Sequence, residues 1–344
     1  MVNNGFSCNG NCTDFPELNG NDNSFMSSLK EEKEAFDKKN QIKPTTIYHY
    51  THFQGLKGIL ESRCLWLTDF RYLNDSSEIS YSCDQLLNLI IDHVHKLEES
   101  SDVDKDKYWW ERFIQISRNK LPTELNYYVF SFCKEKNYLP AWRLYANDGC
   151  GFAIAFDRDR LMQQDRGSNP SPRVFGEYEI FYGIKKFDTL INRYFELSIN
   201  EIYKASSKNF YGHEEQCFYT YLLGCLASHI SDLLPRIKHD SYKEEHEYRL
   251  IEVEFVNKEQ NKRCKIHIPN EKRIWSENNI LMPFRNTIPR TISDQFDHDC
   301  ISKIWVGPGL NFKHAKHDIN ELLKQYGYKD VEIIQSDIPY RSKK

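Results

Sequence analysis

The chain has 344 residues, of which 40% are hydrophobic, 14% aromatic and 28% charged. This composition is close to that of ordinary soluble proteins and supplies enough apolar side chains for a sizeable core. The formal net charge is −4, from 46 basic and 50 acidic residues that are well mixed. No basic block precedes residues 341–344, which argues against a broad electrostatic surface for nucleic acid.

The pattern of cysteines and the N-terminal sequence indicate the cellular compartment in which we expect the protein. None of the ten cysteines forms a C-x-x-C pair, and several lie in apolar runs. This usage is typical of small buried side chains in a reducing environment. The N-terminus has no basic region followed by an apolar stretch, and no run of about 18 apolar residues occurs. We therefore expect a cytoplasmic protein with no membrane contact.

The predicted elements begin with an N-terminal part of distinct composition. Residues 1–24 are rich in Asn, Gly and Ser, and we expect a disordered arm there. Residues 25–43 contain a stretch with a serine cap and lysines in its last turn, which predicts a helix. Residues 44–344 are expected to form a single domain.

Short strands and helices follow in an irregular order. Strands are predicted from β-branched and aromatic content or from alternation, and helices from apolar spacing. Pro140 is expected to start the short helix at residues 141–147, and Gly149 is expected to end it as a left-handed cap. The predicted strands are residues 45–51, 64–70, 127–133, 151–157 and 174–183, and the predicted helices are residues 53–62, 77–98, 106–119 and 141–147.

A long helical region at residues 186–236 precedes the last strands. Strands are predicted at residues 247–255, 263–269, 301–307 and 331–339, with an amphipathic helix at residues 314–328. The strands do not alternate regularly with helices of crossover length, which argues against a doubly wound parallel sheet. We predict an α+β fold with a split, mostly antiparallel sheet, in which residues 186–236 are a helical insertion.

The strand at residues 247–255 carries the first candidate site. A period of two places Glu247 and Arg249 on the same face as Ile251, and that face is expected to be the buried one. The two residues are either an ion pair at a strand end or a cleft carboxylate with its neighbour, because a partly buried glutamate is costly without a partner or a task. Glu245 completes an E-x-E pattern.

The first predicted strand carries the second candidate. His49 and Thr51 share one face of this strand and Tyr50 lies on the other. A short helix follows at once, with Thr51 or His52 as its cap, and its free N–H groups could receive an anion. His49 is therefore either a hydrogen-bonded structural residue or part of a binding turn.

The third candidate lies between residues 130 and 156. Ser131 stands between two phenylalanines in a strand, and Trp142 and Tyr145 share a helix face because they are three apart. Small residues form one face of the strand at 151–157. Aromatic rings beside such a face suit a stacked base or nicotinamide, and close packing of a helix on the sheet is the alternative.

Patterns for several other chemistries are missing. No histidine and cysteine set has complete metal-ligand spacing, so we expect no metal site. The G-x-S-x-G turn of serine hydrolases and the G-x-x-x-x-G-K phosphate loop do not occur.

Motifs in a fixed order resemble a bacterial and phage domain family of unknown function. The resemblance is expected to cover about residues 46–340. The residues that carry it are His49-Tyr50-Thr51, Leu56 with Ile59-Leu60, Trp66 with Asn74-Asp75, Phe130-Ser131-Phe132-Cys133, Trp142 with Tyr145-Ala146, Gly151, Ile154 and Phe156, Glu245 with Glu247-Tyr248-Arg249-Leu250, and Ile301 with Ile304, Gly307 and Pro308.

A second resemblance suggests an activity. The opening H-Y-T strand and the E-x-E strand resemble those of ADP-ribosyltransferases that act on nucleic acid. The resemblance implies that His49 holds the NAD ribose and that Ser131 supports the site. It also implies that Glu247 binds the ribose 2′-OH and stabilises an oxocarbenium-like transition state. The implied NAD-binding residues are His49, Tyr50, Thr51, Trp142, Tyr145 and Arg249.

Three functions follow as hypotheses. The first is an ADP-ribosyltransferase-like enzyme that uses NAD to modify a nucleic-acid or protein target, as a phage-defence or toxin effector with a regulatory or antitoxin partner. The second is a non-catalytic sensor that binds a nucleotide or peptide, with Glu247 and Arg249 as a structural pair. The third is a Mg²⁺-dependent nuclease that uses Asp69, Asp75 and Glu247.

Overall fold

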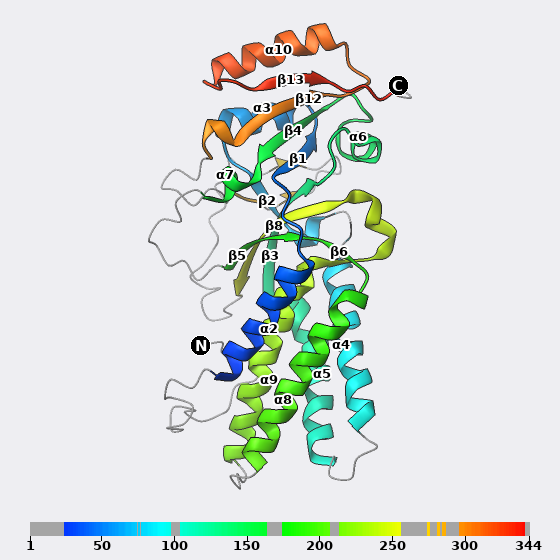
Figure 1. The fold of residues 1–344 in the computed structure, drawn as a ribbon, viewed down its shortest axis with the longest axis vertical. Helices are drawn as coiled ribbons and strands as arrows, with labels where there is room; N and C mark the ends of the chain where they lie inside the picture. Colours follow the sequence, from blue (N-terminus) through cyan, green and yellow to red (C-terminus); the bar gives the residue numbers. More distant parts are fainter. Residues whose placement is uncertain are drawn as a thin grey trace. The chain divides into compact units, whose positions relative to one another are not determined.

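The computed structural model divides into two compact units, which are described separately (Figure 1). Unit 1 combines Met1–Gln41, Asp75–Asn126 and Phe181–Asp240, and unit 2 combines Ile42–Asn74, Tyr127–Ile180 and Ser241–Lys344. The fold is α+β, as predicted. Within these units the structure describes residues 24–73, 75, 77–97, 104–163, 174–206, 213–255, 274–275, 281–282, 284–286 and 296–340.

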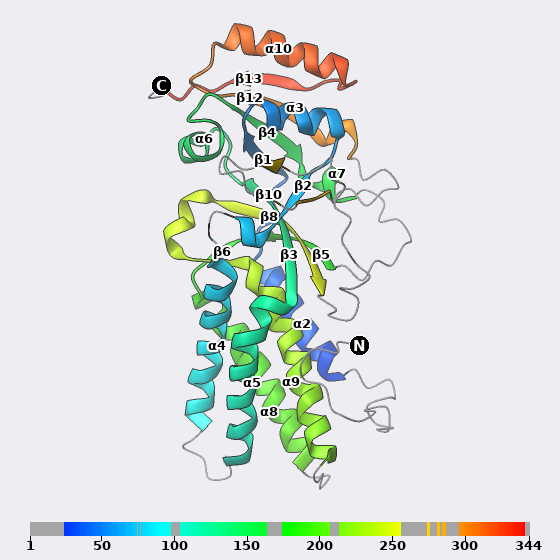
Figure 2. The same cartoon turned by 180° about the vertical axis from the view of Figure 1, so that it is seen from behind.

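Unit 1 is mainly helical. Its long helices run side by side in both views, with α2 against α8 and α9 (Figures 1 and 2). Two short strands, β6 (Phe181–Tyr182) and β7 (Ile237–Lys238), pair in parallel. The helices are α2 (Ser24–Asn40), α4 (Glu78–Leu97), α5 (Asp104–Glu124), α8 (Asp188–Ser206) and α9 (His213–Leu233).

The helical part is larger than the insertion predicted at residues 186–236. That segment supplies α8 and α9, but α2, α4 and α5 pack with them because an amphipathic helix must bury its apolar face. The helix predicted within residues 25–43 is α2, and the arm predicted at residues 1–24 lies, except for Ser24, outside the described residues. No described helix is long and apolar enough to cross a membrane.

Unit 2 is built on a curled, mostly antiparallel sheet in the order β11-β2-β3-β1-β4-β12-β13, with β8 paired to both β3 and β5. Strands β12 and β13 are parallel, whereas β1 runs antiparallel to β3 and β4. A separate two-stranded sheet pairs β9 (Ile274–Trp275) with β10 (Leu281–Met282) in antiparallel orientation. The sheet strands are β1 (Thr46–Thr51), β2 (Trp66–Asp69), β3 (Leu125–Cys133), β4 (Phe152–Asp157), β5 (Val174–Glu179), β8 (Glu247–Phe255), β11 (Phe284–Asn286), β12 (Ile301–Val306) and β13 (Glu332–Gln335).

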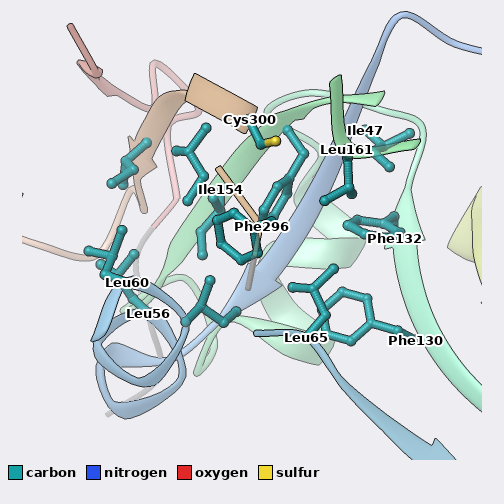
Figure 3. Close-up of a cluster of buried hydrophobic side chains, with 14 of the residues drawn as sticks. Ile47, Leu56, Leu60, Leu65, Phe130, Phe132, Ile154, Leu161, Phe296 and Cys300 are labelled. Carbon is teal, nitrogen blue, oxygen red and sulfur yellow. The ribbon is translucent and has the colours of Figure 1, made fainter. Parts of the chain in front are cut away.

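One face of this sheet, here called the core face, carries the main apolar cluster (Figure 3). Ile47, Phe130 and Ile154 of the strands belong to this cluster together with Leu56 and Leu60 of α3. Helices on this face are α3 (Phe53–Ser62), α7 (Arg158–Gln163) and α10 (Phe312–Gln325), and α10 runs along β12 and β13 in both views (Figures 1 and 2).

The opposite face is covered by α6 (Leu139–Tyr145) and is here called the α6 face. Tyr50, Cys133 and Ala153 pack there under Ala141 and Trp142. Because side chains alternate along a strand, Ile47 and His49 of β1 lie on the core face and Tyr50 lies on the α6 face.

The expectation that β8 buries one face is wrong. Tyr248 and Leu250 belong to the main cluster, while Ile251 and Val253 on the other face are buried as well. The reason is that residues far away in the sequence pack on both faces of β8, which is an interior strand paired with β3 and β5. The strand predicted at residues 263–269 lies outside the described residues.

Candidate functional site

The site is centred on the carboxylate of Glu247, at the start of β8. Ser131 Oγ donates a hydrogen bond of 2.5 Å to Glu247 Oε1, across 116 positions of sequence. Arg249 donates from Nε to Oε1 (2.6 Å) and from Nη2 to Oε2 (2.8 Å). Three of the residues singled out in the sequence therefore meet in one hydrogen-bonded group.

This group is largely removed from solvent. Glu247 is 5% exposed and Arg249 is 1% exposed. A buried charge is tolerated when its partner and hydrogen bonds offset the lost hydration, and the two-point contact supplies both. The arrangement fixes the carboxylate in one orientation.

Tyrosines connect α6 to the segment just before β8. Tyr145, 39% exposed, donates from its hydroxyl to Glu245 Oε1 (2.7 Å). Tyr138 donates to Glu244 Oε2 (2.9 Å). Burial, the bond to Glu245 and the charges of Glu245 and Glu247 raise the pKa of Tyr145 far above its usual range. Burial and the bond to Glu244 raise the pKa of Tyr138 to about 12.

A backbone turn at His246 separates Glu245 from Glu247, the two acids of the E-x-E pattern. The sequence pattern did not predict this turn. The φ of His246 is +46°, in the left-handed region that non-glycine residues seldom adopt. Its carbonyl accepts a hydrogen bond from the Lys134 N–H (2.9 Å). The turn breaks strand alternation, so Glu245 reaches Tyr145 while Glu247 lies against Ser131.

His49 does not join this group. Its ring lies on the core face, with its centroid 4.5 Å from that of Phe130 and 6.3 Å from that of Phe132. Its Nδ1 donates to the Ser131 carbonyl oxygen (3.1 Å), while the Ser131 side chain points to the α6 face. Burial lowers the pKa of His49 to about 4. The expectation that His49 and Glu247 line one pocket is corrected: they lie on opposite faces of the sheet.

Tyr50 and Trp142 pack in the interior. Both are buried, with the Tyr50 ring edge-on to Trp142 at 4.9 Å between centroids. The small-residue face of β4 is closed by α6, and a Cβ on Gly151 would meet the Ala146 carbonyl oxygen at 2.8 Å. This face therefore serves close helix packing and is not open to a stacked ring. Of the two aromatic residues expected to stack on a ligand, Tyr145 is the exposed one.

A side chain of the turn after β1 caps the N-terminus of α3. His52 is the N-cap of α3, and its Nδ1 accepts from the Gly55 N–H (3.2 Å), as the sequence suggested. Thr51 is buried, with its Oγ1 3.5 Å from His52 Nδ1. Of the helix N–H groups that were expected to receive an anion, that of Gly55 therefore already has an acceptor.

The acids of the nuclease hypothesis have local partners. Asp69 accepts from the Arg71 N–H (3.0 Å) and Nε (2.8 Å), and Asp75 accepts from Ser77. Among the described residues, no group of three or more His, Cys, Asp or Glu side chains is placed to hold a metal ion.

A comparison with protein families gives one match. Residues 141–250 match a family described as "Protein of unknown function (DUF2971)". No curated protein and no solved structure matches the chain.

The matched segment begins in α6 and ends in β8. It includes the W-x-x-Y-A and E-x-E-Y-R-L motifs, and it is shorter than the expected span of residues 46–340. The H-Y-T and G-P motifs lie outside it. The family match at residues 141–250 thus confirms the predicted resemblance to a domain family of unknown function.

Proposed function

We propose that unit 2 carries an ADP-ribosyltransferase-like site, with NAD as substrate and a nucleic-acid or protein acceptor. The observation that carries this proposal is the 2.5 Å hydrogen bond from Ser131 Oγ to Glu247 Oε1. The resemblance assigned a supporting serine and a transition-state glutamate to these two distant residues. Their contact supports that assignment.

The proposed reaction breaks the N-glycosidic bond between ribose C1 and nicotinamide. An acceptor atom bonds to C1, the acceptor releases its proton, and nicotinamide leaves as a neutral base. Positive charge grows on the ribose in the transition state, where a carboxylate held in a fixed orientation stabilises it. Ser131 and Arg249 hold Glu247 in that orientation, so little reorganisation is needed during the reaction.

Tyr145 is the candidate for contact with the nicotinamide or the acceptor. It is the exposed aromatic residue of α6, and the charge of Glu247 contributes to its raised pKa. His49 has no part in this form of the proposal, because its ring lies on the core face.

A non-catalytic binding module is the second candidate. The two-point bond between Arg249 and Glu247, with both side chains buried, is also what a structural ion pair requires. In that case Glu247 orders the start of β8, and the exposed Tyr145 contacts a nucleotide or a peptide.

Substitution of Glu247 separates the two candidates. Glu247→Gln keeps the shape and removes the charge, so an enzyme should lose about 100-fold or more of its NAD turnover at a temperature where the variant is still folded. Nicotinamide release from NAD, with nucleic acid and protein mixtures as acceptors, measures this loss. Glu252→Gln is the matched control, because Glu252 is a buried acid on the other face of the same strand.

Stability alone does not separate the candidates. Glu247→Gln lowers the melting temperature in both, because Arg249 loses its charged partner, and adding Arg249→Met recovers much of that loss. Turnover by the wild type that is lost in folded Glu247→Gln and not recovered by Arg249→Met supports the enzyme. Wild-type protein that releases no nicotinamide with any acceptor overturns it.

A further inference from the structure

The C-terminal segment at residues 336–340 is fastened to the loop that precedes α6. Asn137, in that loop, donates from Nδ2 to Asp337 Oδ1 (2.5 Å) and accepts at Oδ1 from Ser336 Oγ (2.6 Å). The same Oδ1 accepts from Trp142 Nε1 (3.0 Å), in the middle of α6. One side chain thus links residues 336 and 337 to α6, the helix that carries Tyr145.

The backbone at Asn137 is suited to this task. Its φ is +48°, which turns the loop sharply, and asparagine tolerates this region better than most residues. Ser336 is buried, and its Oγ also accepts from the Ile338 N–H (3.3 Å). Ile338 packs on the cluster that contains Trp142. The segment therefore contacts α6 both through Asn137 and by direct packing.

A second fastening holds the far end of α6. The Tyr340 hydroxyl donates to Asp148 Oδ1 (2.5 Å), next to Gly149, whose N–H caps α6 by donating to the Trp142 carbonyl (3.0 Å). A Cβ on Gly149 would lie 3.1 Å from the Tyr340 ring. Residues 335–340 also line a hollow of about 620 Å³ together with Pro308, so the segment is not packed on every side.

We propose that residues 336–340 and Asn137 form a clasp that fixes α6, and that opening the clasp frees α6 and its last residue, Tyr145. Asn137 is then a positioning residue, because it acts on the candidate site through Trp142 and α6. The clasp stands on contacts that do not depend on the reaction proposed for the site.

A charge swap across the clasp tests this inference in the full-length chain. Asn137→Asp keeps the oxygen that accepts from Trp142 and Ser336 but sets two carboxylates against each other where Nδ2 met Asp337. Asp337→Asn alone keeps an oxygen acceptor for Asn137 and is the matched control. The double variant, Asn137→Asp with Asp337→Asn, restores a donor and an acceptor with their positions exchanged.

Hydrogen exchange of the amides in residues 139–146 and 336–340 is the measurement. Loss of a charge-assisted bond and its replacement by repulsion should speed exchange in both stretches by about tenfold or more in Asn137→Asp. The double variant should return both to within about threefold of the wild-type rate. This readout does not depend on NAD turnover, so it separates failure of the clasp from failure of the proposed function.

Two outcomes would overturn the clasp. One is faster exchange in residues 336–340 with unchanged exchange in α6, and the other is a double variant that remains as fast as Asn137→Asp. If Asn137→Asp does not fold, Ser336→Ala replaces it, because it removes the donor to Asn137 without adding charge. The same two stretches should then exchange faster together, and exchange in α6 at the wild-type rate would again reject the proposal.

Discussion

His49 shows how one partly buried side chain makes stability depend on pH. Burial lowers its folded-state pKa to about 4, against about 6.5 for an unfolded histidine. Between these values the unfolded chain binds a proton that the folded chain does not, so stability falls as pH falls through this window. The full loss below pH 4 is about 3 kcal/mol, at about 1.4 kcal/mol for each pKa unit.

His49→Gln should flatten this part of the pH profile. Glutamine keeps an N–H donor for the Ser131 carbonyl but does not titrate. Urea unfolding at pH 7, 5.5 and 4.5 should therefore show a smaller loss of free energy in the variant than in the wild type. His314→Gln, at an exposed position of α10, should leave the wild-type profile unchanged. Equal acid sensitivity of His49→Gln and wild type would show that other groups set the profile.

The same residue shows where prediction from sequence stops. Alternation within β1 correctly separated His49 from Tyr50, but it could not say which face Ser131 would share. That depends on the pairing of β1 with β3, where Tyr48 lies opposite Cys133, and such a register forms between residues far apart in the chain. The contact of Ser131 with Glu247 likewise depends on the pairing of β3 with β8.

At the scale of elements, local signals predicted more than long-range packing. Proline at residue 140 correctly marked the start of α6, whereas the helix ends at Tyr145 with Ala146 as its C-cap, before the left-handed cap predicted at Gly149, whose φ is +82°. By contrast, β8 was predicted to bury one face, because its own pattern does not show that distant parts of the main cluster pack on Tyr248 and Leu250. The burial of Glu247 and Arg249 is explained by their bonds to each other and by the bond from Ser131 to Glu247.

Helix α2 was predicted correctly from its own sequence, but its anchoring was not. Phe25, Leu29 and Phe36 are buried, and acidic and basic residues of α2 pair with α8, α9 and the turn after α9. Asp37 pairs with the fully buried Arg236, and Lys33 pairs with Asp232. Burial lowers the pKa of Lys33 to about 8, which shows how dry this contact is.

Asp37→Asn should destabilise unit 1. Arg236 then keeps its buried charge but loses a carboxylate, which costs on the order of 2 to 4 kcal/mol. Adding Arg236→Met should recover part of this, since both charges are then gone. Glu34→Gln is the control on the same helix: its pair with Lys30 is exposed, so the change should stay within about 0.5 kcal/mol. Hydrogen exchange in α2, α8 and α9 measures the effect, and equal changes for Asp37→Asn and Glu34→Gln would contradict it.

At the scale of the whole molecule, each unit is assembled from three separated segments of the chain. The sequence pattern suggested that residues 186–236 were an insertion in an otherwise complete domain. In the structure these residues cover aromatic side chains of α5: Trp110 contacts Phe195 of α8 (4.8 Å between centroids), and Trp109 stacks on Tyr219 of α9 (4.7 Å). Removal of α8 and α9 would therefore leave α5 with an uncovered apolar face.

Replacing residues 186–236 by a short Gly-Ser linker distinguishes these two views. A true insertion would leave a monomeric protein with unchanged exchange in the rest of the chain. We expect instead aggregation or strong binding of a hydrophobic dye, because each exposed aromatic side chain returns about 150–250 Å² of mostly apolar surface to water. Protection should be lost in α2, α4 and α5, since α8 and α9 cover part of the apolar face of each of these helices. A monomer by size-exclusion chromatography, with α4 and α5 protected as in the full chain, would show that the insertion view was right and that these helices form a stable unit alone.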